Sequence, residues 1–137
     1  MSVVAKVTIA APAKRVWTTL TSPRDMACWM GGVSDLTFDG DGLLRLGSRI
    51  SFTTRGRTVE SEVIAFEALH RLAFRSRQGP VEATYTYLIR GHEPVTLTHE
   101  IDCIVRGFAR IFRPLIVGAI RRSDGPHAER VRALSTA

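Results

Sequence analysis

The histidine at position 99 is the residue with the clearest chemical potential in the sequence. It lies in the segment 95–105, where apolar residues such as Leu97 and Ile101 alternate with polar ones, so its imidazole is expected on the apolar side of a strand. A buried imidazole without a hydrogen-bond partner loses about 1–3 kcal/mol. Two interpretations stay open: a core histidine satisfied by a neighbouring tyrosine or backbone group, or a pocket group that orients a ligand carbonyl or hydroxyl, or moves a proton.

Two tyrosines on the neighbouring alternating segment could act beside this histidine. Tyr85 and Tyr87 stand two positions apart, about 6–7 Å along one side of a strand. Their hydroxyls could donate hydrogen bonds to a ligand while their rings form its wall, or they could be ordinary strand aromatics. No Ser/His/Asp pattern indicates a nucleophile, and no second group for general acid–base catalysis is identified. His99, Tyr85 and Tyr87 are therefore the only catalytic candidates, and the catalytic residues are otherwise unassigned.

Metal and cofactor sites are not indicated by the spacing of the potential ligands. The four histidines, of which His127 is the last, have no spacing that would place two of them at one metal. The run Asp39-Gly40-Asp41-Gly42 lacks the later ligands and the distant glutamate of a calcium loop, and is expected to be a turn. We expect no metal and no cofactor.

The two cysteines indicate a reducing environment. Cys28 and Cys103 lie far apart among apolar neighbours, so both are predicted to be buried small hydrophobes and not a disulfide or a metal pair. The first residues lack the basic and apolar run of a signal peptide, and no apolar stretch reaches the ~20 residues that span a bilayer. A cytoplasmic protein is expected.

Composition predicts one folded domain over residues 1–137. Of the 137 residues, 45% are hydrophobic and 23% are charged, which supports a core and excludes global disorder. The net charge of +6 is concentrated at the end of the chain, where seven arginines from Arg106 onward outnumber the two acidic residues, Asp124 and Glu129. Such a basic end suits an anionic membrane surface or nucleic acid, or it is the solvated face of one helix.

Alternating apolar residues predict seven strands. Their expected ranges are 3–9, 33–38, 48–55, 58–67, 70–78, 81–90 and 95–105. The links between consecutive strands after residue 33 are short, which favours antiparallel neighbours, because a parallel crossover needs a dozen or more residues.

Helical spacing predicts two short helices and a long one. Pro12 is expected in the first turn of a helix whose apolar stripe includes Val16 and Leu20, and Ser22 is expected to cap a short helix that begins at Pro23. After Gly107 the spacing predicts a long amphipathic helix, interrupted by Gly125-Pro126 and followed by a short segment. The fold class is therefore α+β: a seven-stranded curved antiparallel sheet wrapped around a long C-terminal helix, with two short helices after the first strand.

Several motifs resemble the START-related SRPBCC superfamily, and within it the polyketide cyclase/dehydrase family. The matching residues are Ala11-Pro12-Ala13-Lys14-Arg15-Val16-Trp17, Leu20-Thr21-Ser22-Pro23-Arg24-Asp25-Met26, Trp29-Met30-Gly31-Gly32-Val33, Gly47 and Leu69-His70-Arg71-Leu72-Ala73-Phe74. The resemblance covers nearly the whole chain and departs at Ser123-Asp124-Gly125-Pro126. It implies a helix-grip fold that holds an apolar or aromatic small molecule between sheet and helix. Some members cyclise polyketides, and others carry lipids or sterols.

Strand parity and helix spacing predict which residues line such a site. Trp29 with Met26 and Met30 is also a candidate gate at the pocket entrance. The expected ligand-binding residues are Met26, Trp29, Met30, Phe52, Ser61, Phe74, Tyr85, Tyr87, Leu97, His99, Ile101, Phe112, Leu115, Ile116 and Ala119.

The function expected from these residues is binding of a small apolar or aromatic ligand, polyketide- or lipid-like, with cyclase or dehydratase activity as an open addition. The alternative is a peripheral membrane or lipid-handling module that uses the arginine-rich C-terminal helix without catalysis. Specific nucleic-acid binding is not expected, because the aromatic residues alternate inward and form no exposed stacking platform. A monomer and a homodimer both fit the sequence.

Overall fold

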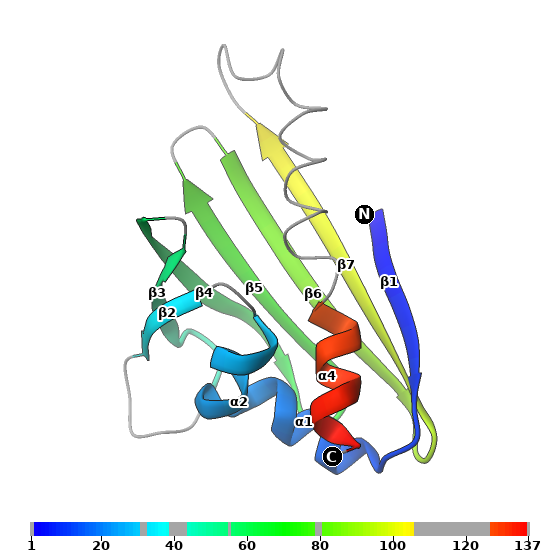
Figure 1. The fold of residues 1–137 in the computed structure, drawn as a ribbon. Coiled ribbons are helices and arrows are strands. Elements are labelled where there is room, and N and C mark those ends of the chain that lie inside the picture. The colour runs from blue at the N-terminus through cyan, green and yellow to red at the C-terminus, as the bar shows by residue number, and fades with distance from the viewer. Residues whose placement is uncertain are drawn as a thin grey trace.

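The computed structural model describes residues 2–30, 33–38, 44–54, 56–78, 81–105 and 127–136, and shows a seven-stranded antiparallel sheet with helices on one side (Figure 1). The strands are β1 (Ser2–Ile9), β2 (Val33–Phe38), β3 (Arg49–Thr54), β4 (Arg57–Glu67), β5 (Arg71–Gln78), β6 (Val81–Gly91) and β7 (Val95–Val105). The helices in the described ranges are α1 (Ala13–Thr21), α2 (Pro23–Trp29) and α4 (His127–Ser135). The predicted strands are confirmed.

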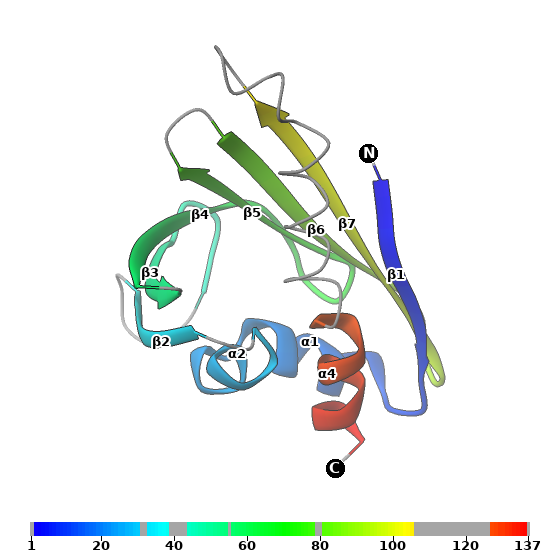
Figure 2. The ribbon, with the colours of Figure 1, turned by 45° about the horizontal axis from the view of Figure 1, so that its top comes forward.

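The strand order is β1-β7-β6-β5-β4-β3-β2, and all neighbours are antiparallel. Strands β2 to β7 follow one another as a meander, because each short link returns the chain beside the strand it has just left. Only β1 is placed out of sequence order, next to β7. The sheet is curved, so that β2 and β3 turn toward α2 (Figure 2).

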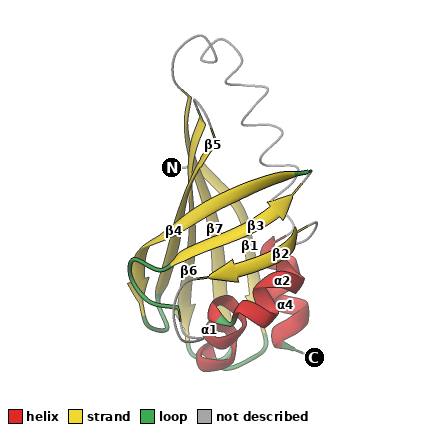
Figure 3. Ribbon diagram, turned by 90° about the vertical axis from the view of Figure 1, so that its left-hand side faces the viewer, coloured by secondary structure: helices red, strands yellow, loops and turns green. Residues whose placement is uncertain are grey.

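The helices cover the concave side of the sheet, near the end where β1 leads into α1 (Figure 3). Pro12 precedes α1 as its cap and does not lie within the first turn as predicted; its carbonyl accepts from the backbone N–H groups of Arg15 and Val16 at 3.0 and 3.2 Å. Pro23 begins α2 and Ser22 is its N-cap residue, both as predicted, although the Ser22 hydroxyl makes no capping bond.

The C-terminal segment after Gly125-Pro126 is the short helix α4, as the resumed apolar spacing predicts. Ala128 and Val131 are fully buried on the face that packs against α1, α2, β1 and β7. The long helix predicted from Gly107 onward falls on residues 106–126, which lie outside the described residues.

The core lies between the concave face of the sheet and these helices. In β7 the side chains of Val95, Leu97, Ile101 and Cys103 are buried, whereas Ile104 on the opposite face is 49% exposed. The prediction that Cys28 is buried was wrong. It lies on the outer side of α2, and this helix of seven residues turns Met26 and Trp29 inward instead.

Candidate functional site

The concave face of the sheet brings most of the predicted site residues together. In the antiparallel registers His99 lies opposite Tyr87, and Ile101 lies opposite Tyr85, which in turn lies opposite Phe74. Because partners in register share a face, these side chains all belong to the concave side. The strand residues placed on this face are Phe52, Ser61, Phe74, Tyr85, Tyr87, Leu97, His99 and Ile101.

The centre of this face is a stack of rings around His99. The His99 ring lies 4.4 Å from that of Tyr87 with 12° between their planes, and 5.6 Å from that of His127 with 11° between their planes. Trp29 meets Tyr87 and His127 edge-on, at 5.3 and 5.5 Å. Strands β6 and β7 and helices α2 and α4 therefore each contribute one ring to the cluster.

His99 is fully buried, and neither ring nitrogen has a hydrogen-bond partner. The expected alternative of a core histidine satisfied by a neighbouring tyrosine is not what the geometry shows, because the Tyr87 hydroxyl pairs with His127 instead. Unpartnered buried nitrogens of this kind are rare in folded proteins and each costs about 1–3 kcal/mol. His99 is thus the polar group on this face with unused hydrogen-bonding capacity.

His127 makes two hydrogen bonds, one at each ring nitrogen. Its Nε2 lies 3.0 Å from the carbonyl oxygen of Met30, which only accepts, so Nε2 carries the hydrogen and donates. Its Nδ1 lies 3.2 Å from the Tyr87 hydroxyl. In the neutral ring Nδ1 accepts from this hydroxyl, which can donate as well as accept.

Burial keeps both histidines neutral. It lowers the pKa of His99 from 6.5 to about 3, with a smaller contribution from nearby His127. Burial also lowers the pKa of His127 to about 4; the hydrogen bond to Met30 opposes this shift, and the charge of Arg130 adds to it. At pH 7 each ring therefore offers one donor and one acceptor and carries no charge.

Two serines form the second polar feature of the concave face. Ser61 on β4 and Ser76 on β5 are buried, lie in register and share a hydrogen bond between their hydroxyls. One hydroxyl donates to the other, so each oxygen has a partner, whereas neither ring nitrogen of His99 has one.

The three residues predicted as a gate lie at the C-terminal end of α2. Trp29 is fully buried, and its indole N–H donates to the Thr19 carbonyl at 3.0 Å; Met26 is 1% exposed. Both residues pack in the core, where Trp29 anchors α2 against the ring stack. A gating motion of this helix stays a prediction.

Sequence reasoning missed His127, which has a central place in the ring stack. No contact between two histidines was predicted, yet His99 and His127 stack on one another. One signal was available: Val131 follows His127 by one helical turn on the buried face of α4. Phe112, Leu115, Ile116 and Ala119, predicted to line the site from the long helix, lie outside the described residues.

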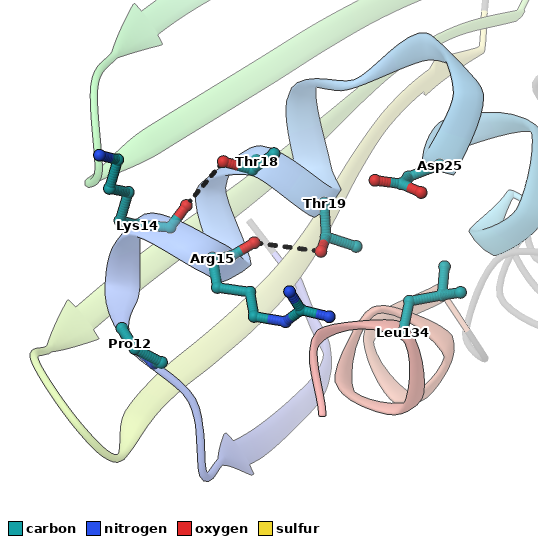
Figure 4. Close-up of a pocket in the computed structure, with 7 residues that line it drawn as sticks. All are labelled: Pro12, Lys14, Arg15, Thr18, Thr19, Asp25 and Leu134. Carbon is teal, nitrogen blue, oxygen red and sulfur yellow. Dashed lines mark hydrogen bonds between the residues drawn. The ribbon is translucent and has the colours of Figure 1, made fainter. Parts of the chain in front are cut away.

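A separate pocket of about 360 Å³ opens between α1, α2 and α4 (Figure 4). It is lined by Pro12, Lys14, Arg15, Thr18, Thr19, Asp25 and Leu134. Much of its polar lining is bonded within the protein: Thr18 and Thr19 donate to the carbonyls of Lys14 and Arg15, and Arg15 Nε donates to the Ser135 carbonyl at 2.6 Å. None of the predicted site residues lines this pocket.

Within the described ranges, no helix is long and apolar enough to cross a membrane.

Comparison with known proteins supplies the family context for this site. The family model described as polyketide cyclase / dehydrase and lipid transport matches residues 1–132. No curated protein matches the sequence.

Solved structures share the fold at low sequence identity. Protein MLL2253 from Mesorhizobium loti is 19% identical, with a TM-score of 0.71 over 95% of this chain and 93% of that one. Protein jhp0584 from Helicobacter pylori is 18% identical, with a TM-score of 0.77 over 96% and 85%. Norcoclaurine synthase from Thalictrum flavum, solved with dopamine and hydroxybenzaldehyde, is 19% identical, with a TM-score of 0.69 over 96% and 84%. The chain has the helix-grip fold that the sequence motifs predicted.

Proposed function

The chain belongs to the polyketide cyclase / dehydrase and lipid transport family, and we propose that it binds a small, largely apolar molecule against the concave face of its sheet. The observation that carries this proposal is His99, a fully buried imidazole with no partner for either ring nitrogen. A polar group on the ligand would supply the missing hydrogen bond and recover the free energy that the empty protein loses.

The chemistry of the face favours a neutral ligand. A neutral imidazole pairs equally well with a hydroxyl, a phenol or a carbonyl, whereas an anion would have to leave water for an apolar site that offers it no positive charge from His99. The Tyr85 ring lies 6.4 Å from the His99 ring, Ile101 lies opposite Tyr85 in register, and Phe74 lies opposite Tyr85 on the next strand, so the face is apolar and aromatic. An aromatic or polyketide-like molecule with one or two hydroxyl or carbonyl groups fits this combination.

The fold supports an aromatic ligand independently. Norcoclaurine synthase, which shares the fold, holds the aromatic molecules dopamine and hydroxybenzaldehyde. We propose that the corresponding ligand here lies between the concave face and the segment that contains Phe112, Leu115, Ile116 and Ala119.

Cyclase or dehydratase activity would be an addition to binding, and His99 would carry it. A neutral imidazole N–H can donate to a ligand carbonyl and polarise it, as an electrophilic group does in enolisation. The membrane-binding alternative rests on the seven arginines from Arg106 onward, of which Arg130 and Arg132 lie in the described residues, and stays a prediction.

A matched ligand series tests the proposal. Naphthalene, 2-naphthol and 2-naphthoate share one aromatic body and differ in the polar group, and their dissociation constants can be measured by fluorescence at pH 7. We expect 2-naphthol to bind about 5- to 10-fold more tightly than naphthalene, and 2-naphthoate to bind most weakly. The preference for 2-naphthol should vanish in His99→Leu and persist in the control His92→Leu, which alters an exposed histidine. An equal preference in the wild type and His99→Leu would rule out His99 as the polar contact.

A further inference from the structure

His127, the first residue of α4, joins three parts of the molecule at the ring stack. It donates to the Met30 carbonyl at the end of α2, accepts from the Tyr87 hydroxyl on β6 and stacks on His99 of β7. We propose that His127 is the positioning residue that docks the N-terminal end of α4 over the ligand-binding face, and that proton uptake by this histidine releases that end and opens the site. This regulation rests on the proposed function, since it acts on the same site.

In the neutral ring the two hydrogen bonds of His127 run from Nε2 to the Met30 carbonyl and from the Tyr87 hydroxyl to Nδ1. A second proton on the imidazole would occupy Nδ1, so the bond to Tyr87 would reverse and run from Nδ1 to the Tyr87 oxygen. His127 is only 4% exposed and Tyr87 2%. Protonation therefore places a positive charge in a buried aromatic cluster, which is the cost that weakens the contact.

The surroundings of His127 disfavour that charge. Among the described elements, the titratable groups that face it are Tyr87 on β6, His99 on β7 and Arg130 on α4 itself. Helix α2 contributes the Trp29 ring and the Met30 carbonyl. The facing residues of β1 are apolar. Together with burial, Arg130 lowers the pKa of His127 to about 4.

The other end of α4 is held by two further hydrogen bonds. Arg15 Nε donates to the Ser135 carbonyl at 2.6 Å, and the Ser135 hydroxyl donates to Thr19 Oγ1 at 3.2 Å. Asp25 and Leu134 lie at this end too, around the outer pocket. Acid therefore weakens the attachment of α4 at His127 and leaves the attachment at Ser135 intact, so the helix opens from one end.

The size of the effect follows from the two protonation equilibria. The closed form has a His127 pKa of about 4, and the open form, with the ring in water, has the ordinary value of 6.5. The stabilisation that the neutral His127 ring gives to the closed form is fully present above pH 6.5 and is lost as the pH falls toward 4. Between pH 7 and pH 5 the open-to-closed ratio rises roughly 20-fold.

Hydrogen exchange on the full chain tests this inference without any ligand. After correction for intrinsic exchange rates, the protection of the amides of residues 131–134, which bond back to the first turn of α4, should fall roughly 20-fold between pH 7 and pH 5, while β5 and β6 remain more strongly protected than α4. In His127→Gln, whose amide can still donate and accept but does not titrate, protection of α4 should not change with pH. His92→Gln, an exposed control, should behave as the wild type does.

Two results would overturn the proposal. One is equal protection of α4 and of β5 and β6 at pH 5, which would mean that α4 exchanges only when the whole domain unfolds. The other is an unchanged pH response in His127→Gln. If that variant does not fold, the ring ¹⁵N shifts of His127 in the wild type decide: the ring must remain neutral at pH 5 while the protection of α4 falls, and a ring that takes up its proton near pH 6.5 overturns the proposal.

A ligand arm separates this inference from the proposed function. The dissociation rate of 2-naphthol should rise roughly 20-fold from pH 7 to pH 5 in the wild type and remain constant in His127→Gln. Absence of 2-naphthol binding together with pH-dependent exchange of α4 would contradict the proposed ligand site and leave the helix release standing.

Discussion

His99, the proposed binding group, lowers the stability of the empty protein. Its two unpartnered nitrogens are buried at a position where an apolar side chain would need no hydrogen bond. Residues that serve a ligand are expected to leave such a deficit in the empty protein, whereas residues selected for packing are not. The same argument separates His99 from His127, whose two nitrogens are both bonded.

Replacement of His99 by leucine should therefore not destabilise the empty protein. Leucine has a similar volume and removes the polar atoms, so we expect the free energy of unfolding to stay within about 1 kcal/mol of the wild type or to rise by about 1–2 kcal/mol. Urea denaturation at pH 7 measures this difference. A loss of more than about 2 kcal/mol would show that the imidazole has a partner in the folded protein.

At the scale of elements, α4 is the helix that connects the sheet to α1 and α2. It reaches the ring stack through His127, the core through Ala128 and Val131, and α1 through Ser135. The helix has only nine residues, too few to be stable in isolation, so its structure depends on these contacts. A defect in packing should therefore loosen the whole helix.

Truncation of Val131 tests this dependence. We expect Val131→Ala to lower the free energy of unfolding by about 1–3 kcal/mol, because it removes two buried methyl groups, and to increase hydrogen exchange throughout α4. The exposed residue Arg132 on the same helix provides the matched control, since Arg132→Ala should cost less than about 0.5 kcal/mol. Equal effects of the two substitutions would contradict the docking of α4 through Val131.

At the scale of the whole molecule, local patterning predicted the sheet well and long-range contacts poorly. The strand predicted over 58–67 is observed as Arg57–Glu67, because both the alternation of apolar and polar residues and the turn at Gly56 depend on residues that are close in the sequence. The same alternation predicted which strand residues lie on the concave face. The contact of His127 with His99 did not, since it depends on how α4 packs on the sheet. The exposure of Cys28 was also missed, because seven residues are too few to define a helical face.

The stability of the whole domain should decrease in mild acid. Both histidines have pKa values lowered from 6.5, to about 3 for His99 and about 4 for His127, so the unfolded chain takes up protons that the folded one does not. The contribution is present above pH 6.5 and is lost as pH falls. Between pH 7 and pH 5 each histidine should lower the free energy of unfolding by about 2 kcal/mol.

Urea denaturation at several pH values checks this dependence. His99→Leu and His127→Gln should each remove about half of the loss between pH 7 and pH 5. His92 is exposed and lies outside the ring stack, so His92→Leu serves as the control. A stability that is flat over this range would contradict the neutral, buried state of the two histidines.

The central claim is that the ligand's polar group bonds to His99, and the ring ¹⁵N chemical shifts of this residue test it most directly. Spectra of histidine-labelled protein would be recorded at pH 7 with and without 2-naphthol. We predict a neutral His99 in both states, with one ring nitrogen shifting on ligand addition as it gains a hydrogen bond, while the shifts of His127 change little. Saturating binding that leaves both His99 nitrogens unshifted would contradict the claim.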